Sequence, residues 1–588
     1  MTVAAGFSAT LVDEWVRAGL TDAVVAPGSR STPLVVALAR ESRMALHVRL
    51  DERSAAFFAL GIGLATGRPA VLVTTSGTAA VEVHAAVVEA HLSRVPLIVC
   101  TADRPPELHH VGAPQTIEQS GLFAGALRWA VDPGVPDEEA RSAWRSLASR
   151  LVAEATAGPL GPGPVHANLS FRDPLLGIPG ELPPGRRNGR PWHRVEPVQR
   201  VLDPGSLAAL ARPAAKGLIV AGAGAGRPET IRRLASTLGW PVLADPRSGA
   251  RIPGETGSPT IAAADSLLRV ESFAGAHLPE VVLRLGQPWA SKVVGEWLTS
   301  CSEAGTVQVL VDPHWAWQDP RREADVVLAA GPDHVMEALM ARAPEAGAPG
   351  RSAWAAPWTW AEGWAEAEVA AQHAIESTLR RHGEANEPAT ARAVFAWAPP
   401  SSTVVASSSM PVRDLEWFAA PRPDPPRVLA NRGANGIDGV TSTTLGVAAA
   451  TGGTGGPVVG LIGDLAFLHD STALVRGRRE PAFGAVLVVL DNGGGGIFSF
   501  LPQALELDEA YFERLFGTPQ RIDVADLARI AGCAVTEVTS REEVPSKLDE
   551  ALSNAARHGP AVVVVRSDRK ANVALHAELE AEVALAVS

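Results

Sequence analysis

Two apolar runs in the C-terminal part of the chain, each ended by polar residues, constrain the fold most. Residues 457–462 and 485–490 have the length and continuity of strands buried on both faces, as in a parallel sheet. Gly463-Asp464 follows the first run and Asp491-Asn492 follows the second. The interval between them is long enough for one crossover helix. We therefore expect Asp464 and Asn492 side by side at the carboxyl ends of adjacent strands, where open α/β sheets bind ligands.

These residue types suit a divalent cation on a phosphate group. Asp464 and Asn492 offer two hard oxygen ligands, and Mg²⁺ needs little more than such a pair, water and phosphate oxygens. The glycine run 493–496 lets the backbone approach a ligand closely and offers a carbonyl as third ligand. The alternative is two ordinary strand-end turns, because Asp, Asn and Gly are common in turns.

Glu52 stands where a predicted strand ends and a predicted helix, residues 55–65, begins. Taken alone, Asp51-Glu52-Arg53 is typical of a solvated helix start. However, Gly463-Asp464 followed after this interval by Asn492 resembles the signature of thiamine-diphosphate enzymes. Such enzymes keep one glutamate on a different domain, where its carboxyl group hydrogen-bonds the aminopyrimidine ring of the cofactor. The resemblance makes Glu52 the candidate, in a partly apolar setting that tunes its proton affinity.

Length and charge limit the class of protein. At 588 residues the chain is too long for one core, and its 46% hydrophobic and 20% charged residues indicate a soluble globular protein. The net charge of −12 argues against a nucleic-acid partner. The three cysteines are isolated, so we expect neither a disulfide framework nor a zinc site. No signal peptide and no run near the roughly 20 residues of a membrane span are visible, which favours a cytoplasmic location.

Alternating strand-like and helical segments predict an α/β fold of three doubly wound parallel sheets. We expect one unit at residues 1–175, a second at 205–342 and a third at 358–588. Stretches rich in Pro, Gly, Ala or Arg at 173–204 and 343–357 are predicted to link them. The first and third units look like two uses of one α/β plan.

The middle unit contains a glycine-rich turn at residues 222–227. A dinucleotide fingerprint requires a third glycine where Arg227 stands. Tight packing of a strand-to-helix turn therefore explains these glycines better than nicotinamide or flavin binding does.

Longer motifs at strand ends carry a more specific resemblance, and they cover nearly the whole chain. They are Pro27-Gly28-Ser29-Arg30-Ser31-Thr32-Pro33, Asp103-Arg104-Pro105-Pro106, Ser409-Met410-Pro411-Val412-Arg413-Asp414, Asn431-Arg432-Gly433-Ala434-Asn435-Gly436-Ile437-Asp438-Gly439 and Gly496-Ile497-Phe498-Ser499-Phe500-Leu501. Together they resemble the menaquinone-pathway family of 2-succinyl-5-enolpyruvyl-6-hydroxy-3-cyclohexene-1-carboxylate (SEPHCHC) synthases, which depend on thiamine diphosphate.

This resemblance implies a transferase. It implies decarboxylation of 2-oxoglutarate, followed by conjugate addition of the resulting succinic semialdehyde–thiamine enamine to isochorismate. The implied cofactors are thiamine diphosphate and Mg²⁺, with Mn²⁺ as the alternative ion. The first unit would bind the pyrimidine end of the cofactor and the third its diphosphate. A homodimer or homotetramer is also implied, because active sites of this superfamily lie at the subunit interface.

The resemblance also assigns residues to roles. The catalytic group is Glu52, which also contacts the cofactor. The metal ligands are Asp464, Asn492 and the backbone carbonyl of Gly494, and the apolar cofactor contacts are Ile497 and Phe498. The substrate contacts are Ser29, Arg30, Arg104, Gln115, Lys292, Ser409, Arg413, Arg432, Ile497, Phe498 and Leu501.

Substrates that each carry two carboxylates would explain the cations among these residues. We expect five cations in strand-end loops: Arg30, Arg104, Arg413, Arg432 and Lys292. Arginine binds carboxylates through two parallel hydrogen bonds. For any one of them a surface role is the alternative. Core packing is the alternative for the apolar residues 497, 498 and 501.

The chain departs from the family pattern at two places. Pro114 stands where the family commonly has Asn, so no side-chain hydrogen bond is available there. The metal loop reads Asp491-Asn492-Gly493 instead of a run of asparagines, which leaves a one-residue slip in the ligand assignment open.

Two other functions remain open from the sequence. One is another thiamine-dependent 2-oxoacid enzyme, such as an acetolactate synthase or a decarboxylase. The absence of a convincing flavin loop disfavours it. The other is a catalytically inactive binding paralogue, which the presence of Glu52, Asp464 and Asn492 together disfavours.

Overall fold

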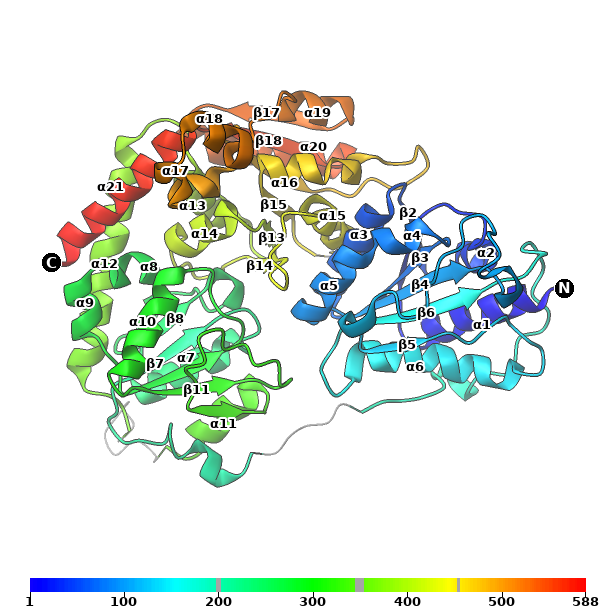
Figure 1. Ribbon diagram of the computed structural model, residues 1–588. Coiled ribbons are helices and arrows are strands. Elements are labelled where there is room, and N and C mark those ends of the chain that lie inside the picture. Colours follow the sequence, from blue (N-terminus) through cyan, green and yellow to red (C-terminus); the bar gives the residue numbers. More distant parts are fainter. Residues whose placement is uncertain (197–201, 344–353, 452–454) are drawn as a thin grey trace.

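Three six-stranded sheets, each parallel throughout, organise the chain (Figure 1). The structure is a computed structural model that describes residues 1–196, 202–343, 354–451 and 455–588. In Figure 1 the N-terminal unit lies at the right, the middle unit at the lower left and the C-terminal unit at the top. The expected α/β fold with three parallel sheets is therefore confirmed.

The N-terminal sheet has the strand order β2-β1-β3-β4-β6-β5. Its strands are β1 (Asp22–Val25), β2 (Ala45–Val48), β3 (Ala70–Thr74), β4 (Leu97–Asp103), β5 (Trp129–Val131) and β6 (Pro164–Ser170). Its helices are α1 (Val3–Arg17), α2 (Thr32–Arg40), α3 (Glu52–Thr66), α4 (Thr78–Glu82), α5 (His84–Ser93) and α6 (Trp144–Ala157). Strands β1, β3, β4 and β6 are buried along their whole length, because helices cover both faces of the sheet.

The C-terminal sheet repeats that order as β14-β13-β15-β16-β18-β17, as expected for one plan used twice. Its strands are β13 (Thr403–Ala406), β14 (Arg427–Ala430), β15 (Val458–Gly463), β16 (Val486–Asp491), β17 (Ala534–Val538) and β18 (Ala561–Arg566). Its helices are α13 (Glu387–Trp397), α14 (Met410–Phe418), α15 (Val440–Thr451), α16 (Asp464–His469), α17 (Gln503–Glu506), α18 (Glu509–Phe512), α19 (Val524–Ile530), α20 (Val544–His558) and α21 (Arg569–Val587).

The middle sheet has a different order, β12-β11-β10-β7-β8-β9, in which the strand order reverses between β7 and β10. Its strands are β7 (Gly217–Ala221), β8 (Val242–Ala244), β9 (Thr260–Ile261), β10 (Val281–Leu285), β11 (Val307–Val311) and β12 (Val326–Leu328). Its helices are α7 (Pro228–Leu238), α8 (Ala264–Leu268), α9 (Glu271–Ala276), α10 (Lys292–Glu303) and α11 (Pro332–Met340).

A long helix, α12 (Trp358–Arg381), ties the middle sheet to the C-terminal part of the chain. The indole Nε1 of Trp360 donates a hydrogen bond to the carbonyl of Gly217 on β7 at 2.9 Å. Trp364 is fully buried in the same hydrophobic core. Of the predicted linkers, residues 197–201 and 344–353 lie outside the described residues.

The N-terminal and C-terminal units share one hydrophobic core, in which α3 packs against α15. Two glycines allow this crossing. A Cβ on Gly61 would lie 2.2 Å from the carbonyl oxygen of Thr443, and one on Gly446 would lie 2.1 Å from that of Phe58. Each helix therefore presents a glycine to the backbone of the other, and the two units meet at close range.

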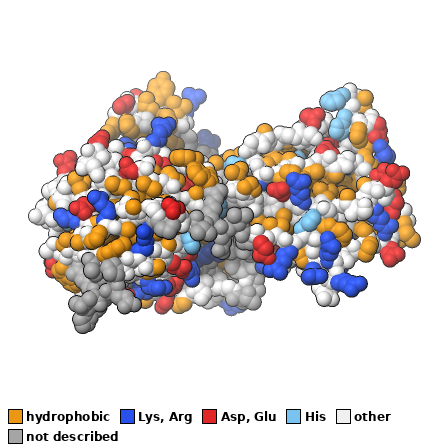
Figure 2. Space-filling model, turned by 90° about the horizontal axis from the view of Figure 1, so that it is seen from below, with side chains coloured by type: hydrophobic (Ala, Val, Ile, Leu, Met, Phe, Trp, Pro, Cys, Tyr) orange, Lys and Arg blue, Asp and Glu red, His pale blue; other side chains and the backbone are white. Residues whose placement is uncertain are grey.

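Side chains of both charges are interspersed over the face seen from below (Figure 2). Although the net charge is −12, the acidic side chains do not form a single patch on this face. Among the described residues, no helix is both long and apolar enough to cross a membrane.

Candidate functional site

Asp464 and Asn492 lie at the carboxyl ends of neighbouring strands, as the sequence predicts. Strands β15 and β16 pair in parallel, with Gly463 opposite Leu490. Asp464 is the first residue of α16, directly after β15, and Asn492 follows β16. The two buried strands therefore bring both side chains to one edge of the sheet.

The oxygen atoms at this edge fit a hard divalent cation. Asp464 accepts backbone hydrogen bonds from Gly494 at 2.7 Å and from Leu465 at 2.8 Å, which fix its carboxylate. Burial raises the pKa of Asp464 to about 7, with a further contribution from Asp491. A buried carboxylate with a raised pKa gains from a nearby positive charge.

Asn492 offers an oxygen atom that suits a bound cation. Its Nδ2 donates to Oε1 of Glu387 at 2.9 Å, while its buried Oδ1 has no hydrogen-bond partner within the described part of the chain. A buried amide oxygen without a partner is costly unless something else binds it. The carbonyl of Gly494 accepts from Gly496 at 2.9 Å and, with two lone pairs, keeps one for a cation.

Among the described residues, no group of three or more His, Cys, Asp or Glu side chains could hold a metal alone. A cation at this edge therefore depends on amide, carbonyl and ligand oxygens in addition to Asp464. That donor set is the one that Mg²⁺ uses when it binds together with a phosphate.

A cavity of about 360 Å³ opens beside these residues, and we call it the diphosphate pocket. It is lined by residues from the loops after β13, β14, β15 and β16. Those with a predicted role are Ser409, Arg413, Arg432, Asp464, Asn492, Gly494, Ile497 and Phe498. The structure thus brings eight predicted site residues together.

The two arginines of the diphosphate pocket have no acid partner among the described residues. Arg413 donates to the carbonyl of Ser409 at 2.6 Å, and Arg432 donates to the hydroxyl of Ser408 at 3.5 Å. Burial lowers the pKa of Arg432 to about 10, with Arg247 and Arg413 adding to the effect. Burial likewise lowers the pKa of Arg413. Two half-buried guanidinium groups in one pocket favour an anionic ligand.

The apolar wall is formed by Ile497 and Phe498, in a 3₁₀ turn that spans Gly496–Phe500. Phe498 packs against Phe516 with ring centroids 5.5 Å apart, which holds the turn in place. Leu501, predicted as a third member, follows this turn, is 39% exposed and does not line the pocket.

A second cavity, of about 540 Å³, lies in the N-terminal unit, and we call it the Glu52 pocket. Predicted residues Ser29, Glu52 and Gln115 line it, together with Asp51 and Glu82. Glu52 opens α3, whose N-cap Asp51 accepts from the backbone of Ser54 at 2.9 Å. Burial raises the pKa of Glu52, and the charges of Asp51 and Glu82 raise it further. The Glu52 carboxyl group is therefore biased toward its protonated form.

Arg30 and Arg104 lie near the Glu52 pocket without lining it. Arg104 donates to the hydroxyl of Ser76 at 2.6 Å, and Ser76 donates to the carbonyl of Gln115 at 2.9 Å. Arg30 donates to the carbonyl of Phe171 at 2.9 Å. The charge of Arg30 contributes, after burial, to the lowered pKa of Arg104, so the two guanidinium groups are neighbours.

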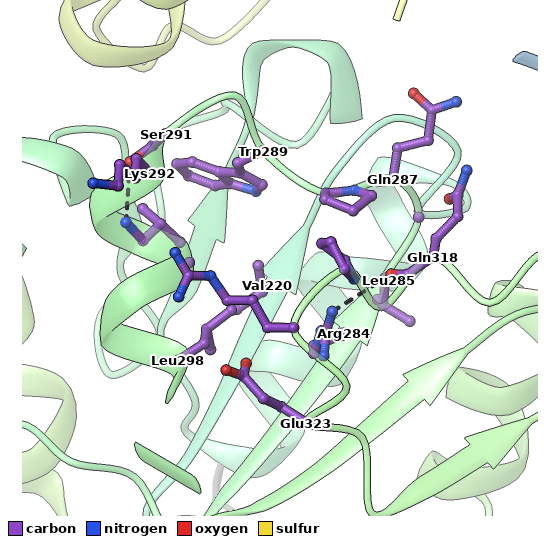
Figure 3. Close-up of a pocket in the computed structure, with 16 residues that line it drawn as sticks. Val220, Arg284, Leu285, Gln287, Trp289, Ser291, Lys292, Leu298, Gln318 and Glu323 are labelled. Atoms are coloured by element: carbon purple, nitrogen blue, oxygen red, sulfur yellow. Dashed lines mark hydrogen bonds between the residues drawn. The ribbon is translucent and has the colours of Figure 1, made fainter. Parts of the chain in front are cut away.

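Lys292 lies apart from both pockets. It begins α10 at the rim of a cavity of about 130 Å³ in the middle unit, where Trp289 and Arg284 also line the wall (Figure 3). Its side chain is 82% exposed and pairs with Glu296 at 3.1 Å. The structure therefore does not bring Lys292 into contact with the other predicted site residues.

Two predicted positions differ in local structure. Arg413 and Lys292 were expected in loops, but each lies in the first turn of a helix, α14 or α10. In both cases a serine precedes the helix, at Ser409 and Ser291. Sequence reasoning also missed Glu387, which is 1% exposed and holds Asn492. A single glutamate before Pro388 carries no pattern that marks it as functional.

Three family models match successive parts of the chain. Residues 1–122 match the N-terminal TPP binding domain of thiamine pyrophosphate enzymes, and 417–565 match their C-terminal TPP binding domain. Residues 186–404 match a model described as the middle domain of thiamine pyrophosphate. The Glu52 pocket thus lies within the first of these regions, and the part of the diphosphate pocket from Arg432 onward lies within the C-terminal one.

Full-length relatives are similar to the chain throughout. A SEPHCHC synthase of Chloroflexus aurantiacus is 40% identical over 95% of this chain and 92% of its own. One of Thermobifida fusca is 41% identical over 100% of both chains. Among solved structures, benzoylformate decarboxylase from Polynucleobacter necessarius matches with a TM-score of 0.69 and 17% identity, over 96% of this chain and 98% of its own. That last likeness bears on the fold alone.

Proposed function

This chain belongs to the SEPHCHC synthase family, and from that premise we propose that it decarboxylates 2-oxoglutarate and joins the remaining four-carbon unit to isochorismate. The observation that carries the proposal is the diphosphate pocket. Among the described residues, it combines an Asn492 amide oxygen without a hydrogen-bond partner and two half-buried guanidinium groups without acid partners. A cation site and anion-binding side chains in one cavity suit a phosphorylated cofactor and acidic substrates.

Thiamine diphosphate supplies, when bound, a carbon nucleophile and an electron sink for decarboxylating a 2-oxo acid. Asp464, Asn492 and the Gly494 carbonyl would hold Mg²⁺ or Mn²⁺ against its diphosphate. The fixed Asp464 carboxylate and the unpartnered Asn492 oxygen support this assignment. Ile497 and Phe498 would pack against the body of the cofactor from the apolar wall.

Glu52 would act on the cofactor through its carboxyl group. Because burial raises its pKa, this group keeps a proton more readily than a solvated glutamate does, and it could share that proton with a ring nitrogen. Its position at the N-terminus of α3 is fixed from the C-terminal unit. The Arg53 guanidinium donates to the carbonyl of His469 at 2.7 Å, and Ser54 hydrogen-bonds Thr472 at 2.8 Å.

The substrates would be recognised through their carboxylates. Arg413 and Arg432 stand in the diphosphate pocket, beside Ser409. Arg30 and Arg104 stand near Ser29 and Gln115 of the Glu52 pocket. Lys292 would approach the substrate from the middle unit, and Leu501 would contact it from outside the diphosphate pocket. Because each substrate carries two carboxylates, several cations are expected near the site, even in a chain of net charge −12.

The two pockets share no lining residue, although the proposed reaction needs Glu52 and the metal on one cofactor. We therefore also propose a homo-oligomer in which each active site combines the Glu52 pocket of one subunit with the diphosphate pocket of another. Dimer and tetramer both satisfy this requirement. The proposal retains the cytoplasmic location favoured by the sequence.

One incubation tests the function and separates it from its rivals. Protein, thiamine diphosphate and Mg²⁺ are mixed with 2-oxoglutarate, with and without isochorismate, while CO₂ release and product mass are followed. When both substrates are present, we expect the adduct that joins the four-carbon unit to isochorismate. Free succinic semialdehyde in place of the adduct would identify a decarboxylase. The absence of CO₂ in both mixtures would identify an inactive paralogue.

A further inference from the structure

Glu89, on α5 of the N-terminal unit, holds a loop of the C-terminal unit. Its buried carboxylate accepts the backbone N–H of Gly433 at 2.8 Å and that of Ala434 at 2.7 Å. These two residues directly follow Arg432, which lines the diphosphate pocket. Figure 1 shows α5 extending from the N-terminal unit toward β14, the strand that precedes this loop.

The loop lies against α5 without spare room. A Cβ on Gly433 would lie 2.8 Å from the Cβ of Leu92 and 2.8 Å from the backbone nitrogen of Ser93. A larger residue would push the loop away from the helix and lengthen both hydrogen bonds that the Glu89 carboxylate accepts. The backbone next to Arg432 is therefore fixed by contacts from another unit.

Glu416, on α14 of the C-terminal unit, holds a loop of the middle unit through hydrogen bonds of the same kind. Its two carboxylate oxygens accept the backbone N–H of Ala290 at 2.8 Å and that of Ser291 at 2.7 Å. It is 1% exposed. The next residue along the chain is Lys292, the cation predicted to reach the substrate from the middle unit.

We propose that Glu89 and Glu416 are positioning residues that hold Arg432 and Lys292 in place for the substrate carboxylates. In each case a buried carboxylate accepts two consecutive backbone N–H groups from a different unit, beside a predicted substrate cation. A carboxyl group that accepts two neighbouring N–H groups at once fixes the direction of the loop backbone as well as its distance. The inference rests on the proposed function, since it assumes that these cations bind substrate.

The proposal explains why the three units must keep one arrangement. A binding site needs its groups held within about 0.5 Å of the productive geometry. Arg432 lies on a loop, and Lys292 directly follows one at the start of α10. Loops shift more easily than helices or strands. A carboxylate on a helix of the neighbouring unit transfers the rigidity of that helix to each loop.

The test compares Glu89→Gln and Glu416→Gln with wild type in steady-state kinetics with both substrates. Glutamine keeps the shape but places an NH₂ group against one of the two N–H donors. We expect KM for a carboxylate substrate to rise about tenfold, with thiamine diphosphate affinity and kcat within about twofold. Glu368→Gln is the matched control. Glu368 is a buried carboxylate that accepts a hydrogen bond of 3.0 Å from the backbone N–H of Ala263, and it lines neither pocket.

Double variants separate positioning of a cation from general support of the fold. If Glu89 acts through Arg432, Glu89→Gln should change KM less than about twofold in an Arg432→Met background. Lys292→Met provides the corresponding background for Glu416→Gln. Equal effects in both backgrounds, or no effect on KM at all, would overturn the proposal. Should a glutamine variant fail to fold, Glu89→Asp and Glu416→Asp, which shorten the contact, replace it in the same cycles.

The wild-type reaction is measured first, which keeps two failures apart. If wild type does not convert 2-oxoglutarate and isochorismate, the proposed function is wrong. If wild type does convert them but the cycles are additive, the function stands and the two glutamates only join the units.

Discussion

At the scale of single residues, Asn492 shows how one side chain is prepared for a ligand. Its amide nitrogen is bound by Glu387, which also accepts from the hydroxyl of Ser567 at 3.1 Å. Gly496 makes room for that amide, since a Cβ there would lie 2.4 Å from Nδ2. The amide oxygen is thereby turned toward the pocket, where the cation is proposed to bind.

This arrangement predicts that Glu387→Gln weakens cation binding. Glutamine can offer an NH₂ group to Asn492 and so no longer fixes which amide atom faces the cation. Partners of a metal ligand typically contribute ten- to hundredfold in metal affinity, and we expect a loss of about that size. Mn²⁺ titration by electron paramagnetic resonance, with thiamine diphosphate present, measures it. Glu384→Gln, at a nearby exposed position, is the control, and equal Mn²⁺ affinity in both variants would contradict the assignment.

Glu52→Gln should retain cofactor binding but lose most of the turnover. The variant keeps a hydrogen-bonding side chain at the start of α3 but cannot exchange a proton. The loss of a positioned acid or base typically lowers the rate on the order of 10²–10⁴-fold. Calorimetric titration with thiamine diphosphate and steady-state rates measure the two effects separately. Near-normal turnover would remove Glu52 from the reaction.

His166 predicts a pH dependence of stability in the N-terminal unit. Burial lowers its pKa from 6.5 to about 4, while its Nε2 lies 2.7 Å from the hydroxyl of Thr101. The unfolded chain takes up a proton below pH 6.5, whereas the folded chain stays neutral there until about pH 4. Stability therefore falls as the pH drops through this window, by about 3 kcal/mol from this residue.

Chemical denaturation of wild type and His166→Gln at pH 7 and pH 4.5 tests this effect. The variant should lose less stability than wild type over the same interval. His110→Gln is the control, because the His110 side chain is 81% exposed. Identical pH dependence in wild type and His166→Gln would show that His166 is not the group responsible.

At the scale of elements, the crossing of α3 and α15 joins the N-terminal and C-terminal units. The helices approach so closely because Gly61 and Gly446 each face a backbone carbonyl of the other helix. The N-terminus of α3 carries Glu52, and the residues before α15 carry Arg432. The angle and distance of this crossing therefore affect both pockets.

Gly446→Ala should destabilise the protein. Its methyl group would lie 2.1 Å from the carbonyl oxygen of Phe58, so one helix has to shift. Inserting a methyl group into a packed contact typically costs about 1–3 kcal/mol, measurable as a lowered Tm. Gly275→Ala, in α9 with no atom within 4 Å, should instead be neutral or slightly stabilising. Equal Tm values for the two variants would contradict the close crossing.

The sequence predicted those elements that a local pattern marks. Apolar runs located β15 and β16, and the residues after them located Asp464 and Asn492, because strand direction and burial leave a pattern in the chain. Short strands such as β9 and β12 leave no such pattern, since two or three residues carry no periodicity. Helix starts at Arg413 and Lys292 were missed because turn residues precede them.

Contacts between distant segments could not be predicted. Nothing local distinguishes Gly446 from a glycine that faces solvent, or Glu89 and Glu387 from glutamates on an exposed helix. Their roles depend on which backbone atoms the fold brings opposite them. The resemblance to a family indicates which residues are proposed to touch ligands, whereas the residues that hold them in place became visible only in three dimensions.

At the scale of the whole molecule, three parallel sheets divide the proposed site among them. The C-terminal unit provides the diphosphate pocket, the N-terminal unit provides the Glu52 pocket, and the middle unit provides Lys292. We propose that this division serves dicarboxylate substrates, with arginines placed to bind a second carboxylate. The choice between substrates with one and with two carboxylates therefore depends on these arginines.

The decisive measurement is the ratio of kcat/KM for 2-oxoglutarate to kcat/KM for pyruvate, with isochorismate as acceptor. Pyruvate lacks the distal carboxylate and would leave a desolvated guanidinium unpaired, at a cost of several kcal/mol. Each 1.4 kcal/mol is about tenfold, so a ratio of roughly a hundred or more is predicted. Arg413→Met and Arg432→Met identify the arginine that binds the distal carboxylate of 2-oxoglutarate. The ratio should fall toward one in the variant that lacks this arginine. Comparable use of pyruvate and 2-oxoglutarate by wild type would contradict the account and favour an acetolactate-type enzyme.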